Sequence, residues 1–166
     1  MNRREFLKFG TVFGTLLAVG GVSLEKVLGQ TDELPFKKIV KTNAEWKKIL
    51  TAEQYYITRE AGTEKPYSHF YTNLKLKGTF VCVCCDLPLF SSKNKYNSET
   101  GWASFYQPIK KINVQEKEDN LLAEKRTEVL CNRCDAHLGH VFDDGPKPTG
   151  LRYCINGVAL KFIKVK

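Results

Sequence analysis

The cysteines of this chain form two clusters and one isolated residue. The segments Cys82–Cys85 and Cys131–Cys134 each contain a pair of cysteines separated by two residues, whereas Cys154 lies alone between Arg152 and Asn156. The thiolate is the form of cysteine that binds metals and attacks electrophiles. The paired cysteines suit a metal ion, which leaves Cys154 available for nucleophilic or redox chemistry.

The two cysteine pairs predict a structural zinc site. Two residues between cysteines allow a tight turn to direct both sulfurs at one ion, and two such turns complete a tetrahedral four-thiolate shell. The predicted ligands of one Zn²⁺ per chain are Cys82, Cys85, Cys131 and Cys134. A redox disulfide of thioredoxin type is the alternative, although neither pair begins a predicted helix. Cys84 is interpreted as a bystander.

Two histidines and a tryptophan are further candidates for a site. His137 and His140 follow the second cysteine pair, and Trp102 follows Gly101. A second metal is not required once four thiolates are present, so each histidine is either a site residue or a satisfied core residue. A buried tryptophan is equally a wall of a pocket or part of a core. The residue types alone leave these alternatives open.

Two short helices are predicted ahead of the cysteine clusters. Thr42 with Glu45 has the pattern of a capping box, and Thr51 with Gln54 repeats it for a second helix that extends to about Glu60. The apolar side chains available to the first helix are Trp46, Ile49 and Leu50. Residues 31–41 are polar and contain proline, which predicts a linker or extended arm.

Short β-type runs separated by turn residues follow Gly78. The candidate strands are Thr79–Cys82, Leu87–Phe90, Ala103–Tyr106, Asn113–Lys117, Thr127–Leu130, His140–Phe142, Tyr153–Ile155 and Val158–Phe162. Their spacing leaves no room for crossover helices, so the sheets should be antiparallel. The predicted fold class is mainly β (α+β by count), with residues 42–166 as one domain.

Residues 1–30 have the composition of an export signal. Arg3 and Arg4 precede an uncharged run of 16 residues, Phe9–Leu24, that includes four glycines. The paired arginines resemble the twin-arginine class of signals, which implies a periplasmic or other extracytoplasmic location. An uncleaved N-terminal membrane anchor is the alternative, although the run is short against the roughly 20 apolar residues of a span.

The net charge of +8 does not indicate a nucleic-acid partner. The lysines are scattered along the chain, and no predicted helix carries a dense basic stripe with interleaved aromatic residues. A solvated basic surface is the better interpretation. Contact with a membrane is expected only through the N-terminal signal, if it is not cleaved.

Several of these segments, taken together, resemble the B-type peptide-methionine sulfoxide reductases, which act on the R epimer of methionine sulfoxide. The matching segments are, in chain order, Thr63–Pro66, Cys82–Cys85, Leu87–Phe90, Thr100–Trp102, Cys131–Phe142 and Pro148–Asn156. The last two are long and specific. The resemblance implies antiparallel sheets braced by zinc, oxidised proteins or peptides as substrates, and a thioredoxin-like or other thiol as reductant.

The resemblance also implies roles for individual residues. Cys154 would attack the sulfoxide as a thiolate and become a sulfenic acid, with Arg152 lowering its pKa from the same face of the strand. His137 and His140 would hold a water or donate to the sulfoxide oxygen. The remaining implied site residues are Trp102 for the S-methyl group, Asn156 as a hydrogen-bonding group, and Phe142 and Asp144 in the substrate pocket, with Asp144 orienting a histidine.

Two departures from the family pattern affect these expectations. Thr100 stands where many relatives have a resolving cysteine, so an external thiol is expected to regenerate Cys154 directly. Ala103 stands where proline is usual beside Trp102, which removes one backbone restriction. A zinc-ribbon-like binding module and a thiol–disulfide oxidoreductase are the competing functional interpretations.

Overall fold

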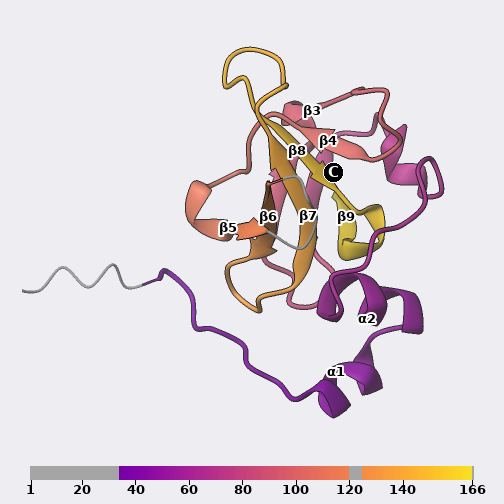
Figure 1. Ribbon diagram of the computed structural model, residues 1–166, viewed down its shortest axis with the longest axis vertical. Helices are drawn as coiled ribbons and strands as arrows, with labels where there is room; N and C mark the ends of the chain where they lie inside the picture. The colour runs from indigo at the N-terminus through magenta and orange to yellow at the C-terminus, as the bar shows by residue number, and fades with distance from the viewer. Residues whose placement is uncertain (1–33, 120–124, 166) are drawn as a thin grey trace, which may run out of the picture. The chain divides into compact units, whose positions relative to one another are not determined.

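The computed structural model of the chain describes residues 34–119 and 125–165 (Figure 1). The predicted export signal at residues 1–30 lies outside this part. Within the described ranges, no helix is long and apolar enough to cross a membrane. Residues 34–41 form neither helix nor strand, and the Ile39 amide donates to the Arg133 carbonyl at 2.8 Å. The predicted arm is thus joined to the second cysteine turn.

Both predicted helices are present and begin where their capping boxes predict. In α1 (Asn43–Ile49), the Thr42 amide donates to the Glu45 carboxylate at 2.7 Å. In α2 (Ala52–Arg59), Thr51 and Gln54 exchange two hydrogen bonds of 3.1 Å. Trp46 is buried, but Ile49 is 58% exposed, so the expected apolar face of α1 reduces to Trp46 and the half-buried Leu50.

In residues 34–119 and 125–165, nine strands form two sheets, and both sheets are antiparallel, as the sequence predicts. The strands are β1 (Gly78–Cys82), β2 (Pro88–Ser91), β3 (Lys95–Tyr96), β4 (Ala103–Phe105), β5 (Val114–Asp119), β6 (Arg126–Cys131), β7 (His137–Phe142), β8 (Arg152–Ile155) and β9 (Leu160–Lys164). The small sheet has the order β2-β1-β9, and the large sheet has the order β3-β4-β8-β7-β6-β5. Short 3₁₀ turns connect them at η2 (Phe70–Thr72), η3 (Ser92–Asn94), η4 (Lys111–Asn113) and η5 (Gly157–Ala159).

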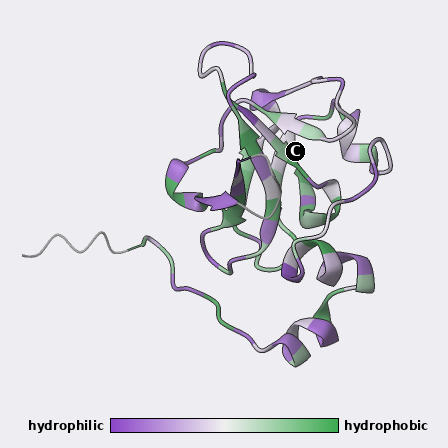
Figure 2. Cartoon of the chain, in the orientation of Figure 1, coloured by the Kyte–Doolittle hydropathy of each residue, from purple (hydrophilic) through white to green (hydrophobic). Residues whose placement is uncertain are grey.

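The two faces of the large sheet differ in character. In β8, Tyr153 and Ile155 are buried in the core, whereas Arg152 and Cys154 alternate with them and are only half-buried. Successive side chains of a strand point to opposite faces. One face of the sheet is therefore apolar, and the other presents polar and potentially reactive side chains. Figure 2 shows that the strands carry both hydrophobic and hydrophilic residues.

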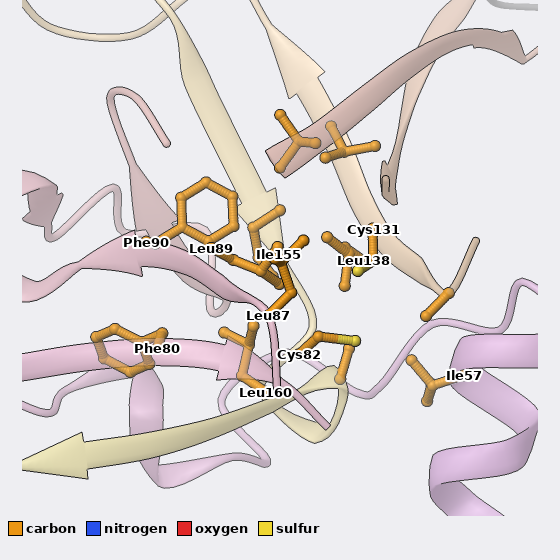
Figure 3. Close-up of a cluster of buried hydrophobic side chains, with 14 of the residues drawn as sticks. Ile57, Phe80, Cys82, Leu87, Leu89, Phe90, Cys131, Leu138, Ile155 and Leu160 are labelled. Carbon is orange, nitrogen blue, oxygen red and sulfur yellow. The ribbon is translucent and has the colours of Figure 1, made fainter. Parts of the chain in front are cut away.

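The core lies between the apolar face of the large sheet and the small sheet. Phe105 of β4 contacts Phe80 of β1 with ring centroids 5.1 Å apart and stacks on Phe90 of β2 at 4.5 Å. Figure 3 shows the wider cluster, in which Phe80 and Leu160 come from the small sheet and Leu138 and Ile155 from the large one. This packing holds the large sheet in place, and the opposite face of that sheet presents Arg152 and Cys154.

Candidate active site and metal centre

A row of polar side chains crosses five strands of the large sheet on the face away from the core. Cys154 of β8 pairs with Ser104 of β4 on one side and with His140 of β7 on the other. Tyr96 of β3 pairs with Ser104, and Glu128 of β6 pairs with His140. Directly opposed residues of antiparallel strands share a face. We call these five residues the Cys154 row.

A β-bulge brings His137 to the same face as His140. Residues three apart on a regular strand point to opposite faces, yet the pairing shifts by one residue between Val129–Gly139 and Leu130–His137. The extra residue of β7 is Leu138, which is buried in the core. The two imidazoles consequently meet edge to face, with ring centroids 5.5 Å apart.

Each histidine is held by a carboxylate that the sequence analysis did not predict. The Nδ1 atom of His137 lies 2.6 Å from Glu128, and the Nε2 atom of His140 lies 2.9 Å from Asp119. Asp119 also accepts from Arg126 at 2.6 Å. Burial lowers the pKa of His137, against an opposing effect of Glu128. The lowered pKa favours the neutral imidazole, and the buried Nε2 of His137 has no hydrogen-bond partner among the described residues.

Asp144 binds Arg152 and does not orient a histidine as expected. Its two carboxylate oxygens accept from Nε and Nη2 of Arg152 at 2.7 and 2.8 Å. The Arg152 guanidinium also stacks 4.2 Å above the Phe142 ring, which faces it across β7 and β8. Bidentate pairing and ring stacking both suit the planar guanidinium. Phe142 and Asp144 thus fix the position of the cation beside Cys154.

The pKa of the Cys154 thiol is raised above its ordinary value by burial. The positive charge of Arg152 and a hydrogen bond with Thr100 act in the opposite direction, whereas the charge of Asp144 adds to the rise. The resemblance implied a lowered pKa for Cys154, whereas burial raises it in this structure. Arg152 nevertheless has the predicted effect, which is to favour the thiolate.

Replacing Arg152 with methionine should move the ionisation of Cys154 to higher pH. The substitution removes the charge that favours the thiolate, so alkylation of Cys154 by iodoacetamide at pH 7 should slow several-fold. Mass spectrometry of the Cys154 peptide across a pH series measures this. Asp144→Asn is the matched control, because loss of its negative charge should move the profile in the opposite direction. If the pH profile of Cys154 alkylation were the same in Arg152→Met as in the wild type, Arg152 would not be the group that favours the Cys154 thiolate.

Trp102 is anchored to the loop that follows α2. Its Nε1 donates to the Glu64 carbonyl at 3.1 Å. Glu64 is 5% exposed, and its carboxylate accepts from the amides of Gly157 and Val158 at 2.8 and 2.9 Å. Glu64 therefore ties Trp102 to the segment that leaves β8. The preceding Gly101 carbonyl accepts from the Thr72 hydroxyl at 3.1 Å, which holds the loop on the other side.

Asn156, which the resemblance implies as a hydrogen-bonding group of the site, uses its side chain to position the backbone in this structure. Its side-chain oxygen accepts from the Glu64 amide at 3.0 Å, and its Nδ2 donates to the Leu138 carbonyl at 3.1 Å. The side chain is 3% exposed, so its hydrogen-bonding groups are used in holding the backbone. Because β8 ends at Ile155, Asn156 lies just beyond the strand that carries Cys154.

Hydroxyl groups line the other side of Cys154. The Ser98 hydroxyl lies 2.8 Å from that of Thr100 and 2.6 Å from that of Ser104. Thr100 lies beside Cys154, to which its side chain is hydrogen-bonded. The Tyr96 hydroxyl is also buried, and it has no hydrogen-bond partner among the described residues. No sequence pattern marked Tyr96 as a site residue.

A cavity of about 460 Å³ opens on the histidine side of the Cys154 row. Its lining residues are Ala61, Thr63, Lys117, Glu118, Asp119, Arg126, Glu128, His137 and His140. The volume is in the range of small-molecule sites. The unpartnered Nε2 of His137 is a lone-pair acceptor in the neutral ring, so it suits a water or a protonated oxygen.

The four paired cysteines meet at one point, as predicted. The sulfurs of Cys82 and Cys134 are 3.6 Å apart, those of Cys85 and Cys131 are 3.5 Å apart, and all four lie within 4.8 Å of one another. A tetrahedral zinc–thiolate site with bonds of about 2.3 Å requires sulfurs about 3.8 Å apart. The four thiols are buried and fit one metal ion. Cys84 instead contacts the Thr58 hydroxyl at 3.4 Å.

Two cysteine turns of the same geometry build this centre. In the first, the Asp86 amide donates to the Cys82 carbonyl at 2.9 Å, and in the second, the Asp135 amide donates to Cys131 at 2.9 Å. Both aspartates have positive φ, at 59° and 56°, a region that aspartate tolerates better than most residues. The metal would therefore join the β1–β2 turn to the β6–β7 turn.

Comparison with known proteins places the chain in a family. The SelR domain model matches residues 50–164, so the chain belongs to the SelR-domain family. It is 53% identical over 125 residues to the peptide methionine sulfoxide reductase MsrB of Hahella chejuensis, covering 75% of this chain and 90% of that protein. It is 49% identical over 150 residues to the human mitochondrial methionine-R-sulfoxide reductase B2, covering 86% and 82%.

A plant relative is longer than the matched region. The chloroplastic peptide methionine sulfoxide reductase B1 of Oryza sativa is 57% identical over 126 residues, which cover 75% of this chain and 58% of the rice protein. The part of this chain that matches the SelR model, residues 50–164, includes the cysteine turns, the histidine segment and β8.

Proposed function

We propose that this chain reduces the R epimer of methionine sulfoxide in oxidised proteins and peptides, with Cys154 as the nucleophile. Membership of the SelR family and the named activities of its relatives support the reaction class. The observation that carries the assignment of Cys154 is its place in the row between Ser104 and His140, outside the four-cysteine cluster.

The first half-reaction needs no reactant besides the Cys154 thiol and the sulfoxide substrate, because the thiol takes up the oxygen that the sulfoxide loses. The thiol sulfur attacks the sulfoxide, the sulfoxide S–O bond breaks, and the oxygen with the thiol proton remains on Cys154 as a sulfenic acid. Methionine leaves as the reduced product. The raised pKa of Cys154 is compatible with this sequence, because the proton of a resting thiol is the one that the departing oxygen needs.

Neighbouring groups assist the transfer of oxygen. The free Nε2 of His137 is suited to hold a water or, once protonated, to donate to the sulfoxide oxygen. Arg152, fixed by Asp144 and Phe142, stabilises negative charge on the sulfur. The Trp102 ring, anchored through Nε1, offers an apolar wall for the S-methyl group.

An external thiol completes the cycle. It attacks the sulfenic acid to release water and form a mixed disulfide with Cys154, and a second thiol then releases the Cys154 thiol and leaves as a disulfide. Thr100 has no sulfur to take part in this step. Cys84 packs against Thr58 beside the four-cysteine cluster, which supports an external reductant of thioredoxin or low-molecular-weight type.

The Tyr96 hydroxyl is assigned as a hydrogen-bond donor to the substrate oxygen, because it is a buried donor on the Cys154 row that has no hydrogen-bond partner among the described residues. Burial raises the pKa of Tyr96, so the hydroxyl stays protonated. One hydrogen bond contributes about 1 kcal/mol, so Tyr96→Phe should lower kcat/KM about five- to tenfold. It should leave the free energy of unfolding unchanged or slightly higher, since an unsatisfied group is removed.

Tyr56→Phe is the control for this substitution, because Tyr56 is half-exposed on α2, a different element. Steady-state kinetics and urea unfolding of both variants give the comparison. Full activity of Tyr96→Phe would remove Tyr96 from the site, and a loss of stability would make it a structural residue.

The ion in the four-cysteine centre is assigned as one Zn²⁺, since buried thiolates in a closed tetrahedral shell are the ligand set that structural zinc prefers. When bound, the ion joins the two cysteine turns. All four ligand positions are filled by sulfur, so the site supports the fold and takes no part in oxygen transfer.

Export by the twin-arginine route is proposed from Arg3, Arg4 and the uncharged run that follows. Such signals are read by a receptor, so replacing both arginines with lysine should retain the charge and yet hold the protein in the cytoplasm. Cell fractionation and immunoblotting of a bacterial host with this route would measure the change. Unaltered export of the double variant would contradict the class of signal.

The epimers of a methionine sulfoxide peptide test the proposed reaction. With dithiothreitol as reductant, the R epimer should be turned over and the S epimer should not. Turnover of S alone would contradict the assignment.

A further inference from the structure

A second, larger cavity of about 830 Å³ borders the edge strand β3. It is lined by residues 72–79, Ser91–Lys93, Lys95–Asn97 and Val165. Four of these residues are lysines: Lys75, Lys77, Lys93 and Lys95. No aspartate or glutamate is among the lining residues. We call this cavity the lysine groove.

The positive charge of the lysine groove is not neutralised within the described protein. None of its four lysines takes part in an ion pair of residues 34–119 and 125–165, whereas Lys38 and Lys161 elsewhere on the surface do. Lys95 is half-buried, and its Nζ donates to the Thr72 carbonyl at 2.7 Å. Burial lowers the pKa of Lys95. An anion in the groove would offset both the burial and the mutual repulsion of the lysines.

The lysine groove lies a short distance from the nucleophile. Tyr96 lines the groove and belongs to the Cys154 row, and two strand spacings separate it from Cys154 through Ser104. Neighbouring strands are about 4.8 Å apart, so the groove begins about 10 Å from Cys154. An extended polypeptide advances about 3.3 Å per residue, so about three residues cover that distance.

The groove also offers apolar contacts beside its charges. Leu76 and Val165 are 49% and 62% exposed at its wall. A polypeptide with acidic side chains could pair its carboxylates with the lysines and pack the aliphatic parts of its side chains against Leu76 and Val165. A small anion such as phosphate would fill little of 830 Å³.

We propose that the lysine groove binds acidic residues of the oxidised polypeptide, starting about three positions from the methionine sulfoxide. The proposal rests on the proposed function and specifies its substrates as methionine sulfoxides flanked on one side by an acidic stretch. Tyr96 and Asn97 form the border between the two parts of the substrate site.

Peptide kinetics with the whole protein test the proposal. Three peptides carry one R-methionine sulfoxide with three glutamates starting three residues before it, three glutamates starting three residues after it, or glutamines at both places. At low ionic strength, one of the two acidic peptides should have a KM about fivefold or more below that of the glutamine peptide, with kcat unchanged. The difference should shrink at 0.5 M salt, because added salt screens the attraction between the exposed lysines and the glutamates of the peptide.

Charge reversal separates the groove from the general charge of the protein. In a variant with Lys75→Glu and Lys93→Glu, the advantage of the acidic peptide should vanish. The matched control has Lys110→Glu and Lys111→Glu, which are exposed lysines outside the groove, and should keep the advantage. The methyl ester of N-acetyl-methionine R-sulfoxide is too small to reach the groove, so both variants should reduce it at the wild-type rate.

The outcomes distinguish this proposal from the proposed function. Equal KM values for all three peptides, or an advantage lost equally in both variants, would overturn the acidic-substrate assignment while the reductase activity stands. The groove would be assigned to another partner if an acidic peptide without methionine sulfoxide bound it and the three methionine sulfoxide peptides still had equal KM values. Failure to reduce any R-sulfoxide would refute the proposed function itself.

Discussion

Replacing Cys131 with serine should remove the metal and lower the stability of the domain by about 4 kcal/mol or more. Cys131 is fully buried, and its sulfur lies 3.5 Å from that of Cys85 on the other cysteine turn. The substitution leaves three buried thiols without their ion and releases the β1–β2 turn from the β6–β7 turn. Elemental analysis of the purified variant and its urea unfolding, followed by circular dichroism, measure both losses.

Cys84→Ser is the control for this experiment, because Cys84 belongs to the first cysteine turn, Cys82–Cys85, but lies outside the four-cysteine cluster. It should retain one metal ion per chain and nearly full stability. Loss of the metal in Cys84→Ser but not in Cys131→Ser would mean that the ligands have been assigned to the wrong cysteines.

Replacing Cys154 with serine should reduce methionine-R-sulfoxide turnover by about a thousandfold or more. Oxygen transfer to a serine would require an O–O bond, whereas transfer to a thiol gives a stable sulfenic acid. Cys154 is outside the four-cysteine cluster and half-buried, so metal content and unfolding should match the wild type.

Steady-state kinetics with R-sulfoxide peptides measure this loss, and Cys84→Ser again serves as the control, with activity retained. Turnover by Cys154→Ser at the wild-type rate would contradict the assignment of Cys154 as the nucleophile. It would favour the interpretation of the protein as a zinc-ribbon-like binding module. Loss of folding together with activity would be visible in the metal analysis.

Much of the fold could be predicted because its signals are local. The capping residues Thr42 and Thr51 start their helices as predicted, since a cap is defined by residues within one turn. The antiparallel arrangement followed from strands too close for crossovers. The strand β3 was not predicted, because two residues, Lys95 and Tyr96, are too few to show the alternation of polar and apolar side chains that marks a strand.

The finer geometry of the site could not be read from local patterns. The bulge at Leu138 changes which face His137 occupies, and the strand was accordingly predicted to begin only at His140. Glu128 and Asp119 reach the histidines through the pairing of three strands. A sequence does not show such register, whereas it does show cysteine spacing. The clustering of Cys82, Cys85, Cys131 and Cys134 was therefore predicted from the sequence.

Substrate labelled with oxygen-18 on the sulfoxide tests the central claim most directly. Protein incubated with the labelled R epimer and no reductant should form about one methionine per chain, and rapid mass spectrometry should find one oxygen-18 atom on the Cys154 peptide. The S epimer should give neither product. Methionine formed with unlabelled Cys154, or with the label on another cysteine, would contradict transfer of the sulfoxide oxygen to Cys154.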